Sequence, residues 1–149
     1  MKTKVYLAYG SNLNIAQMRY RCPLARPLAT TILKGWELTF RGNNNRGVAT
    51  IEKNKDSNVA ALLWQITPSC EKSLDIYEGF PHLYRKETLT VKHEGKTIKA
   101  MVYILNEGPS LASPSASYFN TILSGYRSCN LDETIFFNAV HKTMEVISE

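Results

Sequence analysis

The sequence predicts an α+β fold in which a mostly antiparallel β-sheet curls towards a small barrel, with a few α-helices at its edges. Apolar and β-branched runs separated by short turn signals occupy the first two-thirds of the chain, and helical patterns occupy the last third. Short connections between successive strands favour antiparallel pairing. The chain has 149 residues and is 44% hydrophobic, which suits one core, so we expect one domain over residues 1–149.

The strands are predicted from four apolar runs and one hairpin. The runs cover residues 4–9, 37–42, 47–53 and 59–66. Between them lie GNNNRG, residues 42–47, and NKDSN, residues 54–58, which predict a turn and a loop. The hairpin covers residues 84–105 and turns at Glu94-Gly95, where glycine supplies a positive φ angle.

Four helices are predicted around this sheet. One begins near Asn12 or Asn14, directly after the first strand. A second runs from residue 69, with Thr67 as a candidate cap, Pro68 in the first turn and Gly79 just past its end. Apolar residues at helical spacing predict the last two helices within residues 113–130 and 131–147.

The connection from the first strand to the first helix, YGSN, contains residues suited to close ligand approach. Gly10 permits a tight turn, and the free N–H groups of the following helical turn point back at this loop. Such a loop would bind an anion or an oxyanion. The alternative is a strand-to-helix turn with no ligand. Neither GxGxxG nor GxxxxGK[ST] is present, so a small group such as an amino-acid carboxylate fits better than a nucleotide.

Glu78 is the candidate catalytic carboxylate. It lies at the end of the predicted second helix, before the aromatic stretch FPHLYRK. A helix C-terminus disfavours negative charge and aromatic neighbours desolvate it, so burial would raise the pKa of Glu78 towards that of a general base. The alternative is an ordinary surface glutamate near a helix end. Asp75, on the same helical face, is a second acid or a packing residue.

The net charge and the cysteine pattern restrict the kinds of partner and the cellular compartment that we expect. The formal charge is +5, but the basic residues are scattered, and the densest group, Arg19, Arg21 and Arg26, suits a solvated helix face or a phosphate contact. Cys22, Cys70 and Cys129 lie far apart and are odd in number, so we expect reduced, partly buried thiols and a cytoplasmic location. No apolar run is long enough to span a membrane.

Cofactor chemistry is not expected from the sequence. His82, His93 and His141 have no spacing suited to a shared metal ion. Cys22 has no adjacent histidine that would lower its pKa and make it a nucleophile. We therefore expect neither a metal ion nor another cofactor.

Four segments, in this order, resemble the γ-glutamylcyclotransferase-like family. They are YLAYGSNLN, GVATIEK with VAALLWQI, SLDIYEGFPHLYRK and SYFNTILSGYRSCNLD. The resemblance covers nearly the whole chain and implies the fold described above. It also implies an enzyme that cyclises the γ-glutamyl moiety of an amine or peptide to 5-oxoproline and releases the free amine, without a cofactor.

The resemblance assigns roles to particular residues. It implies that Glu78 is the general acid and base of the reaction. The substrate loop would consist of Tyr9, Gly10, Ser11, Asn12 and Leu13, and the pocket tyrosines would be Tyr84, Tyr103 and Tyr118. For each tyrosine the alternative is an amphipathic core residue.

Two other function classes stay open at this point. The first is a non-catalytic protein on the same fold that pairs Glu78 with the ammonium group of a small ligand. The second is a nucleic-acid-binding domain, which the dispersed charge disfavours. We expect a small γ-glutamyl compound as partner, no nucleic acid or membrane, and a monomer or weak homodimer. The loop RGNNNRG is expected at the mouth of the pocket. Its residues Arg41, Arg46 and 43–45 would suit a polar or anionic leaving group but do not identify that group.

Overall fold

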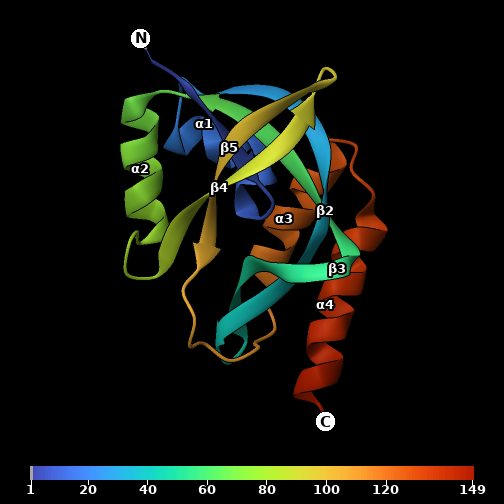
Figure 1. Ribbon diagram of the computed structural model, residues 1–149. Coiled ribbons are helices and arrows are strands. Elements are labelled where there is room, and N and C mark those ends of the chain that lie inside the picture. Colours follow the sequence, from blue (N-terminus) through green and yellow to red (C-terminus); the bar gives the residue numbers. More distant parts are fainter. Residues whose placement is uncertain (1) are drawn as a thin grey trace.

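The computed structural model describes residues 2–149 and shows five strands in one mixed sheet with helices around it (Figure 1). The strands are β1 (Lys4–Ala8), β2 (Arg26–Asn43), β3 (Arg46–Ile66), β4 (Tyr84–His93) and β5 (Lys96–Leu105), in the spatial order β2-β3-β1-β5-β4. The helices are α1 (Ile15–Arg21), α2 (Pro68–Glu78), α3 (Ala116–Ser128) and α4 (Glu133–Ile147), with a 3₁₀ turn η1 (Ser11–Leu13). Three of the four neighbouring pairs are antiparallel and β1–β5 is parallel, so the predicted α+β class is confirmed.

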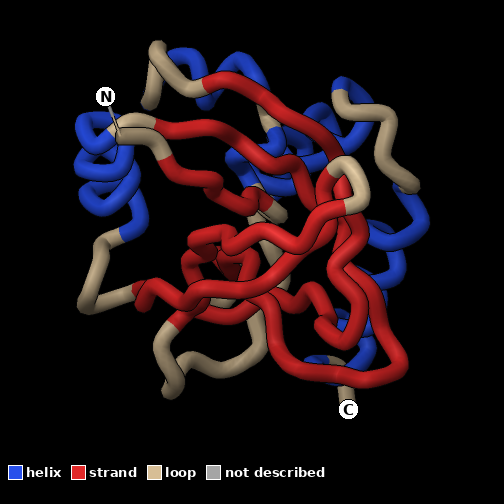
Figure 2. The backbone as a smooth tube through the Cα atoms, turned by 45° about the horizontal axis from the view of Figure 1, so that its top comes forward, coloured by secondary structure: helices blue, strands red, loops and turns tan. Residues whose placement is uncertain are grey.

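The sheet curls because β1 is short and β3 is long. β1 pairs with the last residues of β3 and ends at Ala8. Beyond that point the first half of β3 meets β4 and β5 directly: the Leu105 N–H donates to Thr50 Oγ1 at 3.0 Å, and the Tyr84 hydroxyl donates to the Ala49 carbonyl at 2.7 Å. Figure 2 shows the strands curving round one another with the helices at the periphery. The space left at the end of β1 is where the candidate site lies.

The prediction of a loop at residues 54–58 is wrong, because these residues lie inside β3. The turn signal is nevertheless real: the Asp56 N–H donates to Asn54 Oδ1 at 3.0 Å, a local turn. Because Lys53 and Asn58 both pair with β2, four residues of β3 stand opposite Gly35 alone, and the strand continues through an irregular bulge.

The remaining turns and helix ends agree with the predictions. Asn45 has φ 60° in the tight turn between β2 and β3, and Gly95 has φ 73° in the turn between β4 and β5. The Thr67 hydroxyl accepts a hydrogen bond from the Cys70 N–H at the start of α2, and Gly79 ends α2 in the left-handed conformation. Asn14 caps α1 in the same way as Thr67 caps α2.

The cysteine prediction is wrong for two of the three residues. Cys22, which follows α1, forms a disulfide with Cys70 in the first turn of α2, and their Cα atoms are 5.1 Å apart. Cys129 is free and half-buried, and burial raises the pKa of its thiol. The cytoplasmic location rests on the interpretation of all three as reduced thiols, so it stays a prediction. Within residues 2–149, every helix is too short or too polar to cross a membrane.

Candidate functional site

A cavity of about 190 Å³ lies at the end of β1, between η1, the last turn of α2 and strands β3, β4 and β5. Tyrosine side chains and backbone groups form much of its lining, and Glu78 supplies the charged side chain of the lining. The lining residues are Tyr6, Tyr9, Gly10, Ser11, Asn12, Val48, Ala49, Tyr77, Glu78, Leu83, Tyr84, Tyr103 and Tyr118. The cavity thus brings together all the predicted site residues except Leu13.

The loop that follows β1 forms one wall of this cavity. Gly10 packs closely against β3, because a Cβ on it would lie 3.1 Å from the Ala49 Cβ. Leu13 differs from its neighbours in the loop: its side chain is buried in the core, and its N–H donates to the Gly10 carbonyl at 3.0 Å. The candidate backbone donors are therefore the N–H groups of Gly10, Ser11 and Asn12, at the open end of the 3₁₀ turn.

Asn12 fixes the shape of this wall through every polar group of its side chain. Its Nδ2 donates to the Tyr6 hydroxyl at 2.9 Å, and its Oδ1 accepts from Arg21 Nη1 at 2.5 Å. Its backbone carbonyl accepts from Trp64 Nε1 at 3.0 Å. Because these groups are already bonded to protein, the Asn12 side chain positions the loop and its neighbours.

Glu78 is the last residue of α2 and faces the cavity. Burial raises its pKa from 4.5 to about 7, and the nearby Arg21 charge opposes part of this rise. Hydrogen bonds do not contribute to this shift. Glu78 therefore presents a carboxyl group that is available to a ligand and that exchanges a proton near neutral pH.

Three of the cavity tyrosines direct their hydroxyl hydrogens at protein acceptors. Tyr9 donates to the Tyr103 carbonyl at 2.6 Å, and Tyr84 donates to the Ala49 carbonyl at 2.7 Å. Tyr103 donates to Asp75 Oδ1 at 2.6 Å. Tyr84 and Tyr103, two of the three predicted pocket tyrosines, thus offer a ligand their rings and oxygen lone pairs.

Tyr118 and Tyr6 are different because their hydroxyls accept hydrogen bonds. The Tyr118 oxygen accepts from the Ala49 N–H at 2.9 Å, as the Tyr6 oxygen does from Asn12. Each hydroxyl hydrogen is therefore free to donate into the cavity. Burial raises the pKa of both tyrosines above the ordinary value, so both stay protonated at neutral pH.

Tyr6, Tyr77 and Arg21 are site features that the sequence reasoning did not place there. Tyr6 lies inside a strand, where its pattern matches that of a core residue. The Tyr77 ring stacks under the Arg21 guanidinium at 3.5 Å from the ring centroid, and its hydroxyl is 3.2 Å from Ser11 Oγ. Tyr77 thereby joins the end of α2 to the loop over the cavity. Its position next to Glu78 was the one available signal.

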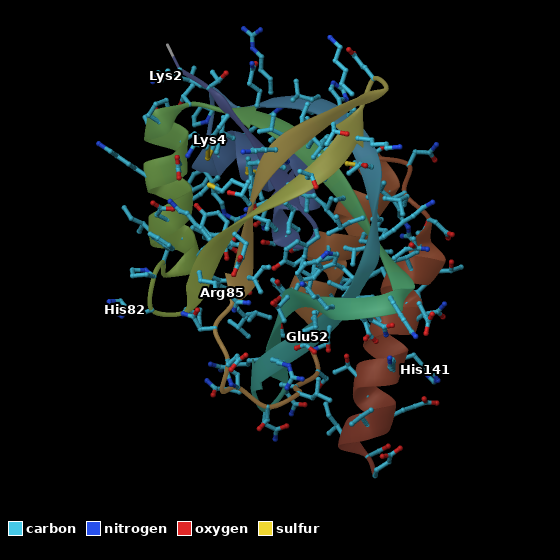
Figure 3. All side chains as sticks on the ribbon, viewed as in Figure 1. Lys2, Lys4, Glu52, His82, Arg85 and His141 are labelled. Carbon is cyan, nitrogen blue, oxygen red and sulfur yellow. A yellow bond between two sulfur atoms is a disulfide. The ribbon has the colours of Figure 1, made fainter. Side chains whose placement is uncertain are left out.

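Other candidate residues lie away from the cavity. Asp75 forms an ion pair with Lys86 at 2.8 Å and holds Tyr103, which agrees with a packing role. Arg41 pairs with Glu52 at 2.6 Å, and both line a different cavity from the one that contains Glu78. His82 and His141 lie at opposite sides of the molecule, so they do not share a site (Figure 3).

Comparisons with known proteins show which family the chain is related to. A family model described as "Gamma-glutamyl cyclotransferase, AIG2-like" matches residues 6–121, a range that includes every predicted site residue. The gamma-glutamylcyclotransferase of Homo sapiens is 29% identical over 136 residues, which are 85% of this chain and 72% of the human protein. That of Mus musculus is 29% identical over 141 residues, which are 89% of this chain and 74% of the mouse protein.

Solved structures show the same fold. A gamma-glutamyl cyclotransferase superposes with a TM-score of 0.80 at 25% identity, covering 96% of this chain and 87% of the other. An uncharacterized protein from Homo sapiens superposes with a TM-score of 0.79 at 27% identity, covering 88% of this chain and 82% of the other. The chain therefore belongs to the gamma-glutamyl cyclotransferase, AIG2-like family.

Proposed function

We propose that the protein is a γ-glutamylcyclotransferase that converts a γ-glutamyl amine or peptide into 5-oxoproline and a free amine. The observation that carries this proposal is the Glu78 carboxyl group, which faces a cavity walled by backbone donors and has a pKa of about 7. Both of its protonation states are populated at neutral pH, as a proton acceptor that later becomes a donor requires.

The reaction draws its nucleophile from the substrate. The α-ammonium group loses a proton to Glu78, and the resulting amine attacks the γ-carbonyl carbon to close a five-membered ring. The bond from that carbon to the leaving nitrogen then breaks, as Glu78 returns a proton to that nitrogen. Holding the amine against the carbonyl makes the attack intramolecular, an advantage of up to about 7–11 kcal/mol in well-oriented systems.

The loop beside Glu78 suits the charges that the substrate carries and develops. The N–H groups of Gly10, Ser11 and Asn12 are candidate donors to the α-carboxylate or to the oxyanion of the tetrahedral intermediate. The free hydroxyl hydrogens of Tyr6 and Tyr118 supply two more neutral donors. This division of roles needs no side-chain nucleophile and no cofactor.

Mass spectrometry can test the proposal directly. We would incubate the protein with γ-glutamyl amines and γ-glutamyl dipeptides and measure 5-oxoproline. Glu78→Gln should reduce kcat by at least about 100-fold, the lower end of what general acid–base catalysis contributes. Glu94→Gln, a change in a carboxylate whose side chain is 82% exposed in the β4–β5 turn, is the control and should leave kcat unchanged.

Two results would contradict the proposal. Equal turnover by the wild-type protein and Glu78→Gln would remove Glu78 from the proton transfers. Binding of these compounds without 5-oxoproline formation would favour the alternative, a binding protein that pairs Glu78 with a ligand ammonium group.

A further inference from the structure

The rim of the cavity carries apolar side chains that protein leaves uncovered. Leu83 is 46% exposed and Tyr77 is 44% exposed, yet both line the cavity. Val48, from β3, is a third apolar residue in the lining. Exposed apolar side chains gathered at the mouth of a cavity are typical of surfaces that contact a ligand.

Leu83 is held firmly at this rim. Its N–H donates to the Gly79 carbonyl at 2.8 Å, and its carbonyl accepts from the Asn106 N–H at 2.9 Å. A Cβ on Gly79 would lie 3.2 Å from the Leu83 Cβ, so Leu83 packs against the residue that directly follows Glu78. Backbone contacts therefore fix Leu83 at the edge of the cavity that Glu78 also lines.

The proposed reaction places the leaving group against this rim. Glu78 returns a proton to the leaving nitrogen, so the substituent on that nitrogen must lie next to Glu78. Tyr77 precedes Glu78 in the chain, and Leu83 packs on the residue after it. A cavity of about 190 Å³ is also smaller than the roughly 300–1,000 Å³ of drug-sized ligand pockets, so the substituent extends to the mouth.

The charges around the cavity disfavour a charged substituent. Glu78 is the charged residue in the lining, and the lining contains neither lysine nor arginine. The nearest guanidinium, that of Arg21, is stacked on Tyr77 and bonded to Asn12 and Gln17. An anionic substituent would meet the Glu78 carboxylate, and the Arg21 guanidinium that offsets part of this charge is already engaged by Tyr77, Asn12 and Gln17. A cationic one would stabilise the ionised form of Glu78 and so oppose the return of the proton.

We propose, resting on the γ-glutamylcyclotransferase function above, that this site prefers γ-glutamyl compounds whose leaving amine carries an apolar, uncharged substituent, and that Leu83 is the residue that determines this preference. Tyr77 and Val48 complete the apolar surface on which the substituent packs.

Three substrates of similar length test the preference. They are the γ-glutamyl amides of isoamylamine, of γ-aminobutyrate and of 1,4-diaminobutane, which present an apolar, an anionic and a cationic substituent. We expect kcat/KM for the isoamylamide to exceed that for each charged amide by at least tenfold. Leu83→Ser should lower kcat/KM for the isoamylamide about tenfold, the lower end of the effect of one apolar contact on specificity. It should change the value for the γ-aminobutyrate amide less than twofold.

Two further variants sharpen the test. Leu83→Lys should raise kcat/KM for the γ-aminobutyrate amide at least fivefold, by placing a cation beside the anionic substituent. Ile76→Ser is the matched control, because Ile76 lies on the same helix as Glu78, is 83% exposed and is not part of the cavity lining. It should leave all three values unchanged.

Different results would overturn the apolar preference and the cyclotransferase function. Equal values for the three amides, or a preference for a charged one, would overturn the apolar preference while 5-oxoproline formation still supported the cyclotransferase function. A Leu83→Ser variant with the wild-type ranking and rates would overturn the role of Leu83. No 5-oxoproline from the three amides while γ-glutamyl dipeptides are turned over would overturn the preference alone, and no 5-oxoproline from either set would overturn the function as well.

Discussion

Glu78 is buried, and no hydrogen bond contributes to its pKa. Burial without such a bond disfavours the ionised form of its carboxyl group. Its folded-state pKa of about 7 exceeds its ordinary value of 4.5, so the folded state binds more protons between these two pH values. The free energy of unfolding should therefore fall as pH rises through this window. Each pKa unit corresponds to about 1.4 kcal/mol, which limits the loss to about 3 kcal/mol.

Glu78→Gln removes this titration, so we predict that the variant matches the wild-type protein at pH 4.5 and is more stable at pH 8 by up to about 3 kcal/mol. Urea unfolding at the two pH values measures the difference. Glu94→Gln, whose side chain is 82% exposed, should follow the wild-type curve. A Glu78→Gln variant that loses as much stability with rising pH as the wild-type protein would show that the pKa of Glu78 is not raised.

Tyr118 and Tyr84 provide a matched pair, because each forms one hydrogen bond with the backbone of Ala49. Tyr84 donates to the carbonyl, whereas Tyr118 accepts from the N–H and keeps its hydrogen for the cavity. Both Tyr→Phe changes should cost about 1–3 kcal/mol of stability, because each leaves a backbone group of Ala49 unpaired. We predict that only Tyr118→Phe also lowers kcat/KM, by about 10- to 100-fold, as expected for a lost bond to a charged substrate group. Equal kinetic effects in the two variants would contradict this assignment.

The sequence predicted Glu78 and the loop around Gly10 from their places at the ends of elements, whereas the family resemblance predicted the pocket tyrosines. Glu78 precedes a glycine that stops a helix, and Gly10 follows the end of a strand with one residue between them. Tyr6 could not be found in this way, since it lies inside β1 and resembles a core tyrosine. Its link to the cavity depends on Asn12, which turns back to donate to the Tyr6 hydroxyl. Local propensity contains no information about such a contact.

At the scale of elements, α3 supports the loop after β1 through Gly125. A Cβ at this position would lie 2.7 Å from the Leu13 carbonyl carbon and 2.9 Å from the Asn14 nitrogen, both backbone atoms that cannot turn aside. We predict that Gly125→Ala destabilises the protein by about 1–3 kcal/mol, the usual cost of overpacking. It should also lower kcat/KM, because α3 then displaces η1 and the N–H groups beside it.

Ser124→Ala is the control for this change, because Ser124 is exposed on the same helix. Urea unfolding and the 5-oxoproline assay should show no change in this variant. A Gly125→Ala variant with normal stability and normal kcat/KM would show that α3 does not set the position of the loop.

The strands show where local patterns fail. The first half of β2, from Arg26 to residue 36, was not predicted, because β2 is an edge strand with many exposed side chains and so has little apolar alternation. Residues 54–58 looked like a loop because their polar side chains do form a local turn. Pairing of both flanks with β2 nevertheless keeps them in β3. In both cases the deciding contacts come from the partner strand.

At the scale of the whole molecule, the disulfide is the feature that the sequence concealed. Cys22 and Cys70 are separated by 48 positions, and their spacing matches no known pairing motif. They meet because α1 packs beside α2 after β1 has inserted between β3 and β5. Both side chains are buried, at 2% and 3% exposure, so the bond lies inside the core.

This disulfide should stabilise the fold mainly by restricting the unfolded chain. For a closed loop of 48 residues, the chain-entropy model gives about 4 kcal/mol. We predict that urea unfolding in the presence of dithiothreitol yields a free energy lower by about that amount than unfolding without it. Alkylation of the urea-unfolded protein followed by mass spectrometry should label Cys129 alone before reduction, and all three cysteines after reduction. Three labelled cysteines before reduction, with the same unfolding midpoint under both conditions, would contradict the bond.

Because α1 carries Arg21 and α2 carries Tyr77 and Glu78, loss of the disulfide should also loosen the contact between Arg21 and Tyr77 at the cavity mouth. A rise in KM on reduction would report this loosening.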